Sequence, residues 1–247
     1  MKWVLDRLGR LIAAYLQRPA PGYEPFTPAD PSALQASIRP GDILLIEGRN
    51  RISGIIKYLT RSTWSHAALY VGSTKDGKAE LVESNLDDGI TCVALSKYFK
   101  LHTRICRPVG LSPEDCEKVC NYAVAKIGLK YDLKNLIDLG RYLLPLPVPQ
   151  RWRRRMIALG SGDPTRLICS TLIAQAFMEV GYPILPAITL IESGHARKEL
   201  FHIRDSSLYT PRDFDISPFF AVLKPTIEVG FDYKRIVWCT DPQSLAR

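Results

Sequence analysis

Short hydrophobic runs separated by turn residues dominate the chain between residues 43 and 108. Runs of about four to eight residues, bounded by Gly, Asp, Asn or Ser, are typical of β-strands. The pattern predicts strands at residues 43–47, 64–72, 79–84, 90–95 and 103–108. Because short turns join most of these runs, we expect an antiparallel sheet that curls into a small barrel.

Hydrophobic residues at helical spacing predict helices that pack against this sheet. One covers residues 51–60, and another covers 112–128, where the pair Ser-Pro is a typical helix start. A third opens at Cys169, ends at Gly181 and carries an apolar stripe. The stripe consists of Leu172, Ile173, Ala176, Phe177 and Val180. The mixture of an antiparallel sheet with packed helices predicts an α+β fold class.

The N-terminal segments have a different pattern. Residues 1–17 place their apolar side chains on one side of a helix, which predicts an amphipathic helix. Residues 18–39 are rich in proline and lack periodicity, so we expect an extended arm without helix or strand. The folded domain is expected to span 40–247, with an apolar and basic insertion at 130–166.

The C-terminal part has weaker signals. Residues 182–191 are rich in loop-forming residues. Residues 208–214 predict a turn into a short helix, and 218–224 and 227–238 predict the last strands.

Charge and composition say more about where the protein is expected in the cell than about what it does. The net charge of +8 favours an anionic surface or substrate without identifying which. Asp6, Arg7 and Arg10 interrupt the apolar run that a cleavable signal peptide needs, and no stretch reaches the ~20 apolar residues of a transmembrane helix. We therefore expect a cytoplasmic protein, with peripheral attachment to the inner membrane as an option.

The six cysteines show no metal-binding spacing with histidine and no paired Cys-x-x-Cys motif. Cys116 and Cys120 fit the apolar stripe of the helix at 112–128 better than they fit a metal site. The sequence therefore predicts neither a metal nor a cofactor.

Cys169 is the candidate with the clearest chemistry, because it lies at the start of a predicted helix. Unpaired backbone N–H groups and the positive end of the helix dipole favour a thiolate at that position. A small buried cysteine fits the same position, so the two interpretations differ in whether a partner base lies beside the thiol.

His66 is the candidate base, and Glu83 is its candidate partner. If the strands at 64–72 and 79–84 form a hairpin, the turn between them places His66 opposite Glu83, and opposed residues point to the same face. A carboxylate there would fix the tautomer of the imidazole and leave its other nitrogen for a thiol. Cys, His and Glu together form an activated nucleophile with an oriented base.

Other residues compete for these roles. Glu47 is the second choice for the acid that orients the histidine. His102, His195 and His202 are alternative bases, but none has a carboxylate placed opposite it by a tight hairpin. We interpret these three as surface or packing histidines.

Five stretches of the chain, in this order, resemble the permuted papain-like cysteine hydrolases of the YiiX/YaeF type, within the NlpC-type superfamily. They are GDILLIEG, WSHAALYVG, LVES, IGLKYDLKN and ICSTLIAQAF. In that branch the histidine strand precedes the cysteine helix, as it does here, and the resemblance covers roughly residues 38–225. It implies a papain-like, circularly permuted fold and cleavage of an amide, such as a cell-wall peptide or an acylated amino group.

The same resemblance implies roles for individual residues. Cys169 would be the nucleophile, His66 the base and Glu83 the orienting acid. Tyr131 stands in a family-like Tyr-Asp pair and is expected at the substrate, although a core position fits it equally well. We also expect Trp64 and Ser65, which directly precede the histidine, to contact the substrate.

Two other functions remain open at this point. Lipid acyltransferases and phospholipases of the lecithin–retinol type share the His-before-Cys order, although they usually carry a second histidine where Glu83 stands. Residues 1–17 and 141–155 would suit an anionic membrane surface, but the arginines at 151–155 also fit a solvated face. The other function is that of an inactive papain-like binding module.

The expected partners are accordingly a peptide amide or a lipid-like substrate, and an anionic membrane surface. A nucleic acid partner is not expected, because no nucleic-acid-reading module accompanies the basic residues. The oligomeric state is left open.

Overall fold

The computed structural model describes residues 30–73, 79–85, 88–129, 168–193, 196–202, 206, 209–225 and 234. These residues form an α+β fold around a six-stranded antiparallel sheet. The strands are β1 (Ile43–Ile46), β2 (His66–Ser73), β3 (Ala79–Asn85), β4 (Gly89–Ala94), β5 (Thr103–Pro108) and β8 (Phe220–Leu223). Their order across the sheet is β4-β3-β2-β1-β5-β8.

The sheet is open, so the predicted closure into a barrel is wrong. After β4 the chain passes through the short 3-10 helix η1 (Leu95–Tyr98) and returns on the far side of β1. Because β5 then pairs with β1, it extends the sheet away from β4 instead of closing on it. Among the described strands, β4 and β8 form the two edges.

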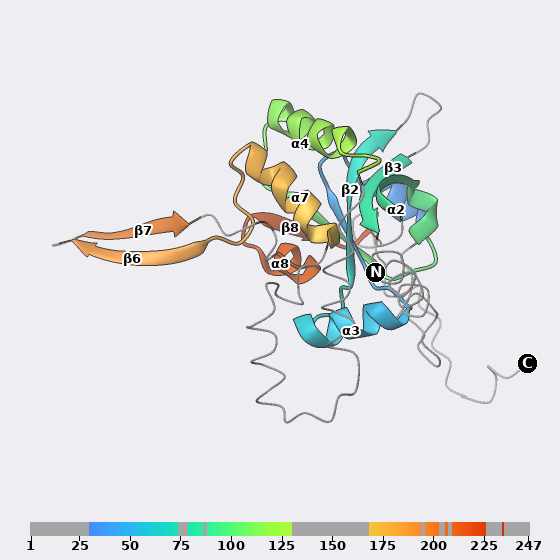
Figure 1. Cartoon of the computed structure of the whole chain (residues 1–247), viewed down its shortest axis with the longest axis horizontal. Helices are drawn as coiled ribbons and strands as arrows, with labels where there is room; N and C mark the ends of the chain where they lie inside the picture. Colours follow the sequence, from blue (N-terminus) through green and yellow to red (C-terminus); the bar gives the residue numbers. More distant parts are fainter. Residues whose placement is uncertain are drawn as a thin grey trace, which may run out of the picture.

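Helices cover both faces of the sheet (Figure 1). One face packs against α4 (Pro113–Ala125), α7 (Ile168–Glu179) and α8 (Pro211–Ile216). The opposite face packs against α2 (Pro31–Ser37) and η1. The sheet is therefore buried on both sides, which explains why all four residues of β1 are buried and show no polar alternation.

Helix α7 buries most of its surface against the sheet. The predicted apolar stripe is confirmed: Leu172, Ile173, Ala176 and Phe177 are each at most 1% exposed. Full burial of one such large side chain stabilises the fold by roughly 1.5–3 kcal/mol. This packing fixes the start of α7 at the end of the sheet where β2 begins.

Helix α2 is a correction to the predicted extended arm. Its N-cap residue Asp30 accepts a hydrogen bond from the Ser32 N–H at 3.0 Å, and Pro31 occupies the first helical position. Ala33 and Leu34 are 2% and 1% exposed in the core. The Asp-Pro pair is a helix-start signal, and the number of neighbouring prolines obscured it in the sequence.

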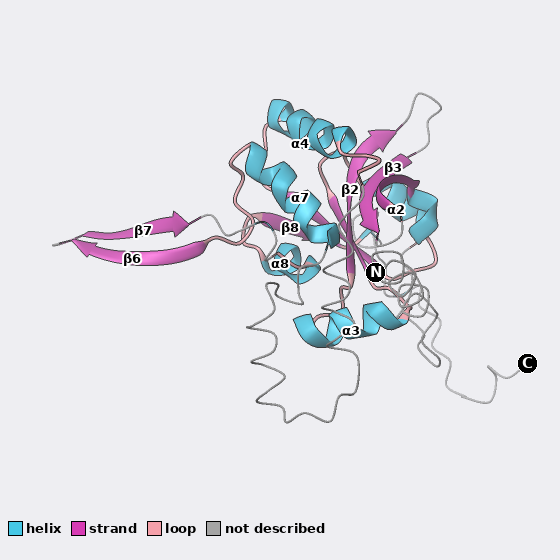
Figure 2. Cartoon of the chain, viewed as in Figure 1, coloured by secondary structure: helices cyan, strands magenta, loops and turns pink. Residues whose placement is uncertain are grey.

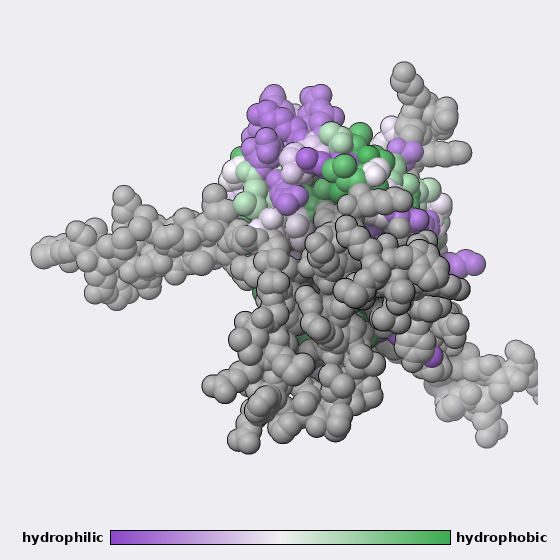
Figure 3. Space-filling view, in the orientation of Figure 1, coloured by the Kyte–Doolittle hydropathy of each residue, from purple (hydrophilic) through white to green (hydrophobic). Residues whose placement is uncertain are grey.

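Helix α3 (Arg51–Thr60) is confirmed at its predicted bounds. Asn50 caps it by accepting a hydrogen bond from the Ser53 N–H at 3.0 Å. Helix α4 begins as predicted with the Ser112 cap, but it ends at Ala125, so Ile127 is 41% exposed and does not continue the buried stripe. Figure 3 shows hydrophilic residues gathered over the outer surface of α4.

A two-stranded hairpin extends away from the body of the molecule (Figure 2). It consists of β6 (Ala187–Ser193) and β7 (Ala196–His202), paired from Ala187 with His202 to Ser193 with Ala196. The prediction of a loop over 182–191 is therefore wrong for residues 187–191, which belong to β6.

Candidate active site

Cys169 is the second residue of α7, so the predicted position at a helix N-terminus is confirmed. The residue is 5% exposed, and its sulfur lies 3.9 Å from the hydroxyl of Ser170. Helix α7 packs against β2 and β3, which carry the other two candidate residues.

The pairing of β2 with β3 differs from the prediction. A register that sets His66 opposite Glu83 would also pair Leu69 with Glu80, but Leu69 pairs with Val82. The register is shifted by two residues. Because side chains alternate with a period of two, this shift keeps His66 and Glu83 on the same face of the sheet.

The two strands stop pairing near this end of the sheet. Their register ends at Leu69 and Val82, although β2 starts at His66 and β3 continues to Asn85. The backbone N–H of Ala67 hydrogen-bonds the sulfur of Cys169. The start of α7 therefore contacts the backbone of β2 next to His66.

His66 and Glu83 form a direct contact. Nε2 of His66 lies 3.1 Å from Oε2 of Glu83, and their side chains are 20% and 0% exposed. An ionised carboxylate only accepts hydrogen bonds, so Nε2 carries a proton in this contact. The nitrogen left for the thiol is then Nδ1.

Glu83 is surrounded by hydrogen-bond donors. Besides His66, Asn85 Nδ2 donates to Oε1 at 2.7 Å, Lys97 Nζ donates to Oε1 at 2.5 Å, and the Tyr98 hydroxyl donates to Oε2. Burial would raise the pKa of Glu83, but the interactions with His66, Lys97 and Tyr98 lower it well below its ordinary value. Glu83 is therefore an anion near neutral pH.

Cys169 and His66 shift each other's pKa in opposite directions. Burial would lower the pKa of His66, but the charge of Cys169 and a hydrogen bond to it, followed by those of Glu83, raise it to about 10. Burial would raise the pKa of Cys169, but the charge of His66 and hydrogen bonds from His66, Ala67 and Ser170 lower it. These directions favour a thiolate beside an imidazolium.

The other described cysteines are shifted the opposite way. Burial, followed by Glu80, raises the pKa of Cys92 to about 11 although that residue is exposed. Burial, followed by the charge of Cys116, raises the pKa of Cys120 to about 12, and burial also raises that of Cys106. Over the described ranges, no group of three or more His, Cys, Asp or Glu side chains could hold a metal ion.

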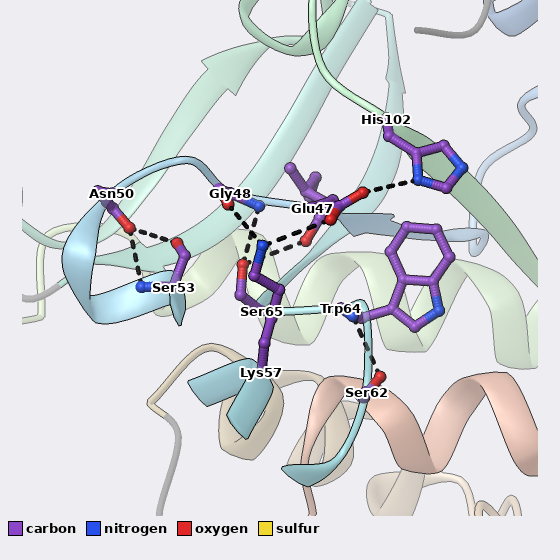
Figure 4. A network of polar contacts seen from close by, with 10 residues as sticks. Glu47, Gly48, Asn50, Ser53, Lys57, Ser62, Trp64, Ser65 and His102 are labelled. Atoms are coloured by element: carbon purple, nitrogen blue, oxygen red, sulfur yellow. Dashed lines mark hydrogen bonds and ion pairs between the residues drawn. The ribbon is translucent and has the colours of Figure 1, made fainter. Parts of the chain in front are cut away.

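A second network lies at the same end of the sheet (Figure 4). His102 Nδ1 is 2.9 Å from Glu47 Oε2, and Lys57 Nζ is 3.4 Å from Glu47 Oε1. The pair joins the ends of β1 and β5, where the Glu47 N–H also donates to the His102 carbonyl at 3.0 Å. Glu47, the second choice for the orienting acid, and His102, an alternative base, are thus partners of each other.

The structure places Trp64 and Ser65 in the interior, each 2% exposed. The Trp64 ring lies 5.0 Å from that of His102, and the Arg104 guanidinium lies 4.9 Å from the Trp64 ring. The Ser65 hydroxyl accepts a hydrogen bond from the Gly48 N–H at 2.9 Å. Their predicted contact with a substrate stays a prediction.

Three residues of the site were not found by sequence reasoning. Lys97 and Tyr98 belong to η1, and Asn85 is the last residue of β3. Only the tertiary path of the chain brings η1 to Glu83. The nearest sequence signal is the run Ser84-Asn85 that directly follows the acid.

Several predictions lie outside the described residues. They concern Tyr131, His195, and the segments 1–17, 130–166 (which includes the membrane-binding candidate 141–155) and 227–238 apart from Lys234. In the part of the chain that the structure describes, no helix has the length and apolar character needed to cross a bilayer.

In this structure the strand that carries His66 precedes the helix that carries Cys169. The family model described as "Permuted papain-like amidase enzyme, YaeF/YiiX, C92 family" matches residues 37–142. That stretch contains His66 and Glu83 and ends before Cys169. The match confirms the predicted resemblance to this family, and it supports a hydrolase of this kind.

The chain is also similar to individual proteins. The chain is 22% identical over 194 residues to the "Probable lipoprotein peptidase YaeF" of Escherichia coli strain K12, covering 70% of this chain and 67% of that protein. A crystal structure of the metalloprotein yiiX from Escherichia coli O157:H7 aligns with a TM-score of 0.46 and 14% identity, covering 75% of this chain and 96% of that one.

Proposed function

We propose that the protein is a cysteine hydrolase that cleaves an amide bond, with Cys169 as nucleophile, His66 as acid and base, and Glu83 as the acid that orients His66. One observation carries this proposal. A buried carboxylate with four donors holds Nε2 of an imidazole, and the same imidazole interacts with a thiol at a helix N-terminus.

The first half of the reaction forms an acyl-enzyme. The Cys169 thiolate attacks the carbonyl carbon of the amide, a C–S bond forms, and the carbonyl electron pair moves onto oxygen. The Cys169 N–H, which lies in the first turn of α7 and has no partner within the helix, is suited to stabilise that oxyanion. As the intermediate collapses, the C–N bond breaks and His66 gives its Nδ1 proton to the leaving nitrogen.

The second half restores the enzyme. Neutral His66 takes a proton from water, and the resulting hydroxide attacks the thioester carbon. The C–S bond then breaks, Cys169 leaves as a thiolate, and His66 remains protonated. Glu83 stays ionised throughout, because the interactions with His66, Lys97 and Tyr98 lower its basicity.

We infer a peptide-type amide as the substrate class. The curated relative is named a peptidase and the matching family an amidase, which supports a peptide or an acylated amino group over a lipid ester. The segments that suggested a lipid substrate, 1–17 and 141–155, lie outside the described residues, and we do not propose a lipid function.

Turnover of defined amides tests the proposal. Peptide para-nitroanilides of different sequence are offered to the wild type, to Cys169→Ala and to Cys92→Ser, with para-nitrophenyl butyrate as an ester probe. Cys169→Ala should abolish hydrolysis of every cleaved amide, and Cys92→Ser should hydrolyse them at the wild-type rate. An acyl-enzyme mass should appear on the peptide that contains Cys169 after rapid acid quenching.

Two results would contradict the proposal. Amide hydrolysis that survives in Cys169→Ala would remove the cysteine from the chemistry. If none of the amides is cleaved and Cys169 reacts with iodoacetamide no faster than Cys92, the inactive binding module becomes the better explanation.

A further inference from the structure

The Glu83 carboxylate divides its two oxygens between two pairs of donors. Oε2 accepts from His66 and Tyr98, whereas Oε1 accepts from Asn85 at 2.7 Å and from Lys97 at 2.5 Å. An ionised carboxylate offers about four acceptor positions, so these donors fill it. The carboxylate cannot turn to exchange its oxygens without breaking all four contacts.

Charges alternate along this line of contacts. Cys169 and Glu83 are acids on either side of His66, and Lys97 is a cation on the far side of Glu83. Among the described residues, the titratable or charged groups that face the His66–Glu83 pair are Cys169 of α7 and Lys97 and Tyr98 of η1. The neutral residues beside the pair are Asn85 of β3, and Ile46 of β1 and Thr91 of β4 at the neighbouring register positions.

Lys97 differs from an ordinary surface lysine in what it contacts. Its side chain is 46% exposed, yet its ammonium reaches a carboxylate whose side chain is 0% exposed. The ammonium also lies 5.4 Å from the centroid of the Tyr98 ring. An exposed ion pair contributes little because water and salt screen it, but screening is weaker when one partner is buried.

We propose that Lys97 is a positioning residue of the site, which fixes Oε1 of Glu83 so that Oε2 faces His66, and whose charge sets the pH range of the Cys169–His66 ion pair. This inference rests on the proposed function. Its physical reason is that a nearby cation favours the deprotonated form of every neighbouring group. Loss of the Lys97 charge should therefore move the titrations of Cys169 and His66 to higher pH.

The test measures the iodoacetamide labelling rate of the peptide that contains Cys169 as a function of pH. In Lys97→Met the midpoint of the acid limb should rise by about 0.5 pH unit at low salt, and the shift should shrink as salt is added. Lys97→Arg keeps the charge and should restore the wild-type midpoint. Lys118→Met is the matched control, because Lys118 forms an exposed ion pair with Asp115 on α4 and should leave the midpoint unchanged.

The outcomes separate this inference from the proposed function. If wild-type Cys169 is labelled faster than Cys92 but Lys97→Met has the wild-type midpoint, the role of Lys97 is wrong and the proposed function stands. An equal shift in Lys97→Arg would show that the charge of Lys97 is not responsible, and would overturn the role given to that charge. If wild-type Cys169 reacts no faster than Cys92, both fail.

Folding is checked by the thermal melt of each variant. Should Lys97→Met not fold, Lys97→Gln removes the same charge with a polar side chain, and the same upward shift is expected. The wild type supplies an independent readout, because added salt should raise its own midpoint. A salt-independent midpoint would contradict the role of the charge.

Discussion

Two histidine–glutamate pairs lie at the same end of the sheet, and they have different surroundings. His66 uses Nε2 to contact Glu83 at 3.1 Å, and His102 uses Nδ1 to contact Glu47 at 2.9 Å. The histidine side chains are similarly accessible, 20% and 27% exposed, and both acids are almost fully buried. Distance and burial therefore do not distinguish the pairs.

The third partner of each histidine makes the difference. His66 interacts with the Cys169 thiol, whereas His102 lies against the ring of Trp64. Glu83 contacts both His66 and Lys97, which lies in η1 outside the sheet. Glu47 contacts both His102 and Lys57 of α3. A histidine–carboxylate pair thus stabilises a strand end in one place and, in our proposal, orients a base in the other.

Replacing each histidine by alanine should give the largest difference in behaviour between the two pairs. His66→Ala returns Cys169 to an ordinary thiol, and at about pH 6 this should lower the labelling rate by about 100-fold or more, because a free thiol with pKa near 8.5 is almost fully protonated there. His102→Ala should keep the rate within about twofold and instead lower the stability by about 1–3 kcal/mol, since buried Glu47 loses a donor. Iodoacetamide labelling and urea unfolding measure the two effects.

Neutral isosteres of the acids give a smaller contrast. Glu83→Gln removes the anion that stabilises imidazolium, so Cys169 labelling near neutral pH should fall by about tenfold. Glu47→Gln should change the melting temperature and leave labelling unchanged. Equal labelling losses in the two variants would show that both acids support the base and would end the distinction.

The titration of His66 should depend on the thiol. In Cys169→Ser the pKa of His66, measured by NMR, should fall below about 10, because Cys169 is the larger of its two raising partners. Burial, the largest influence on this pKa, lowers it and then works against Glu83 alone.

The same variant has a predictable stability profile. A histidine whose pKa is raised by folding stabilises the fold fully below its unfolded pKa, and the stabilisation is lost as pH rises through the folded pKa. If Glu83 keeps the His66 pKa of Cys169→Ser raised against burial, the free energy of unfolding decreases from pH 6.5 upward, until His66 is neutral. A stability that rises over this range in urea titrations would contradict the raised pKa.

The smallest effect is expected where the second network meets β2. Ser65→Ala removes the acceptor of the Gly48 N–H, which should lower the stability by about 1 kcal/mol. Ser65→Thr keeps a hydroxyl and is the matched control for this hydrogen bond. Because His66 keeps its own partners, Cys169 labelling in Ser65→Ala should stay at the wild-type rate.

Much of the fold could be predicted because its elements are local in sequence. The bounds of Arg51–Thr60 and Thr103–Pro108 agree with the structure, and the apolar stripe of α7 lies in the core. The open sheet could not be predicted, because it depends on β5 pairing with the distant β1. The β6–β7 hairpin was missed because Pro183 and Pro186, which precede it in the sequence, are typical of an irregular loop.

Part of the candidate site could likewise be predicted from the sequence, and part of it could not. Cys169, His66 and Glu83 were accessible from helix position and strand alternation, and a register error of two residues did not change the face. Lys97 and Tyr98 were not accessible, because the path of η1 over Glu83 is a tertiary feature. The pairing of His102 with Glu47 was missed for a related reason: it joins β1 to β5 across a long stretch of chain.

The ionisation of Cys169 tests the central claim most directly. The ultraviolet absorbance of a thiolate can be followed against pH as the difference between the wild type and Cys169→Ser. We expect this absorbance to be present at about pH 7, below the ordinary thiol pKa of ~8.5, and to disappear only on further acidification. Its first appearance between about pH 8 and 9 would show an ordinary thiol and would contradict the proposed ion pair with His66.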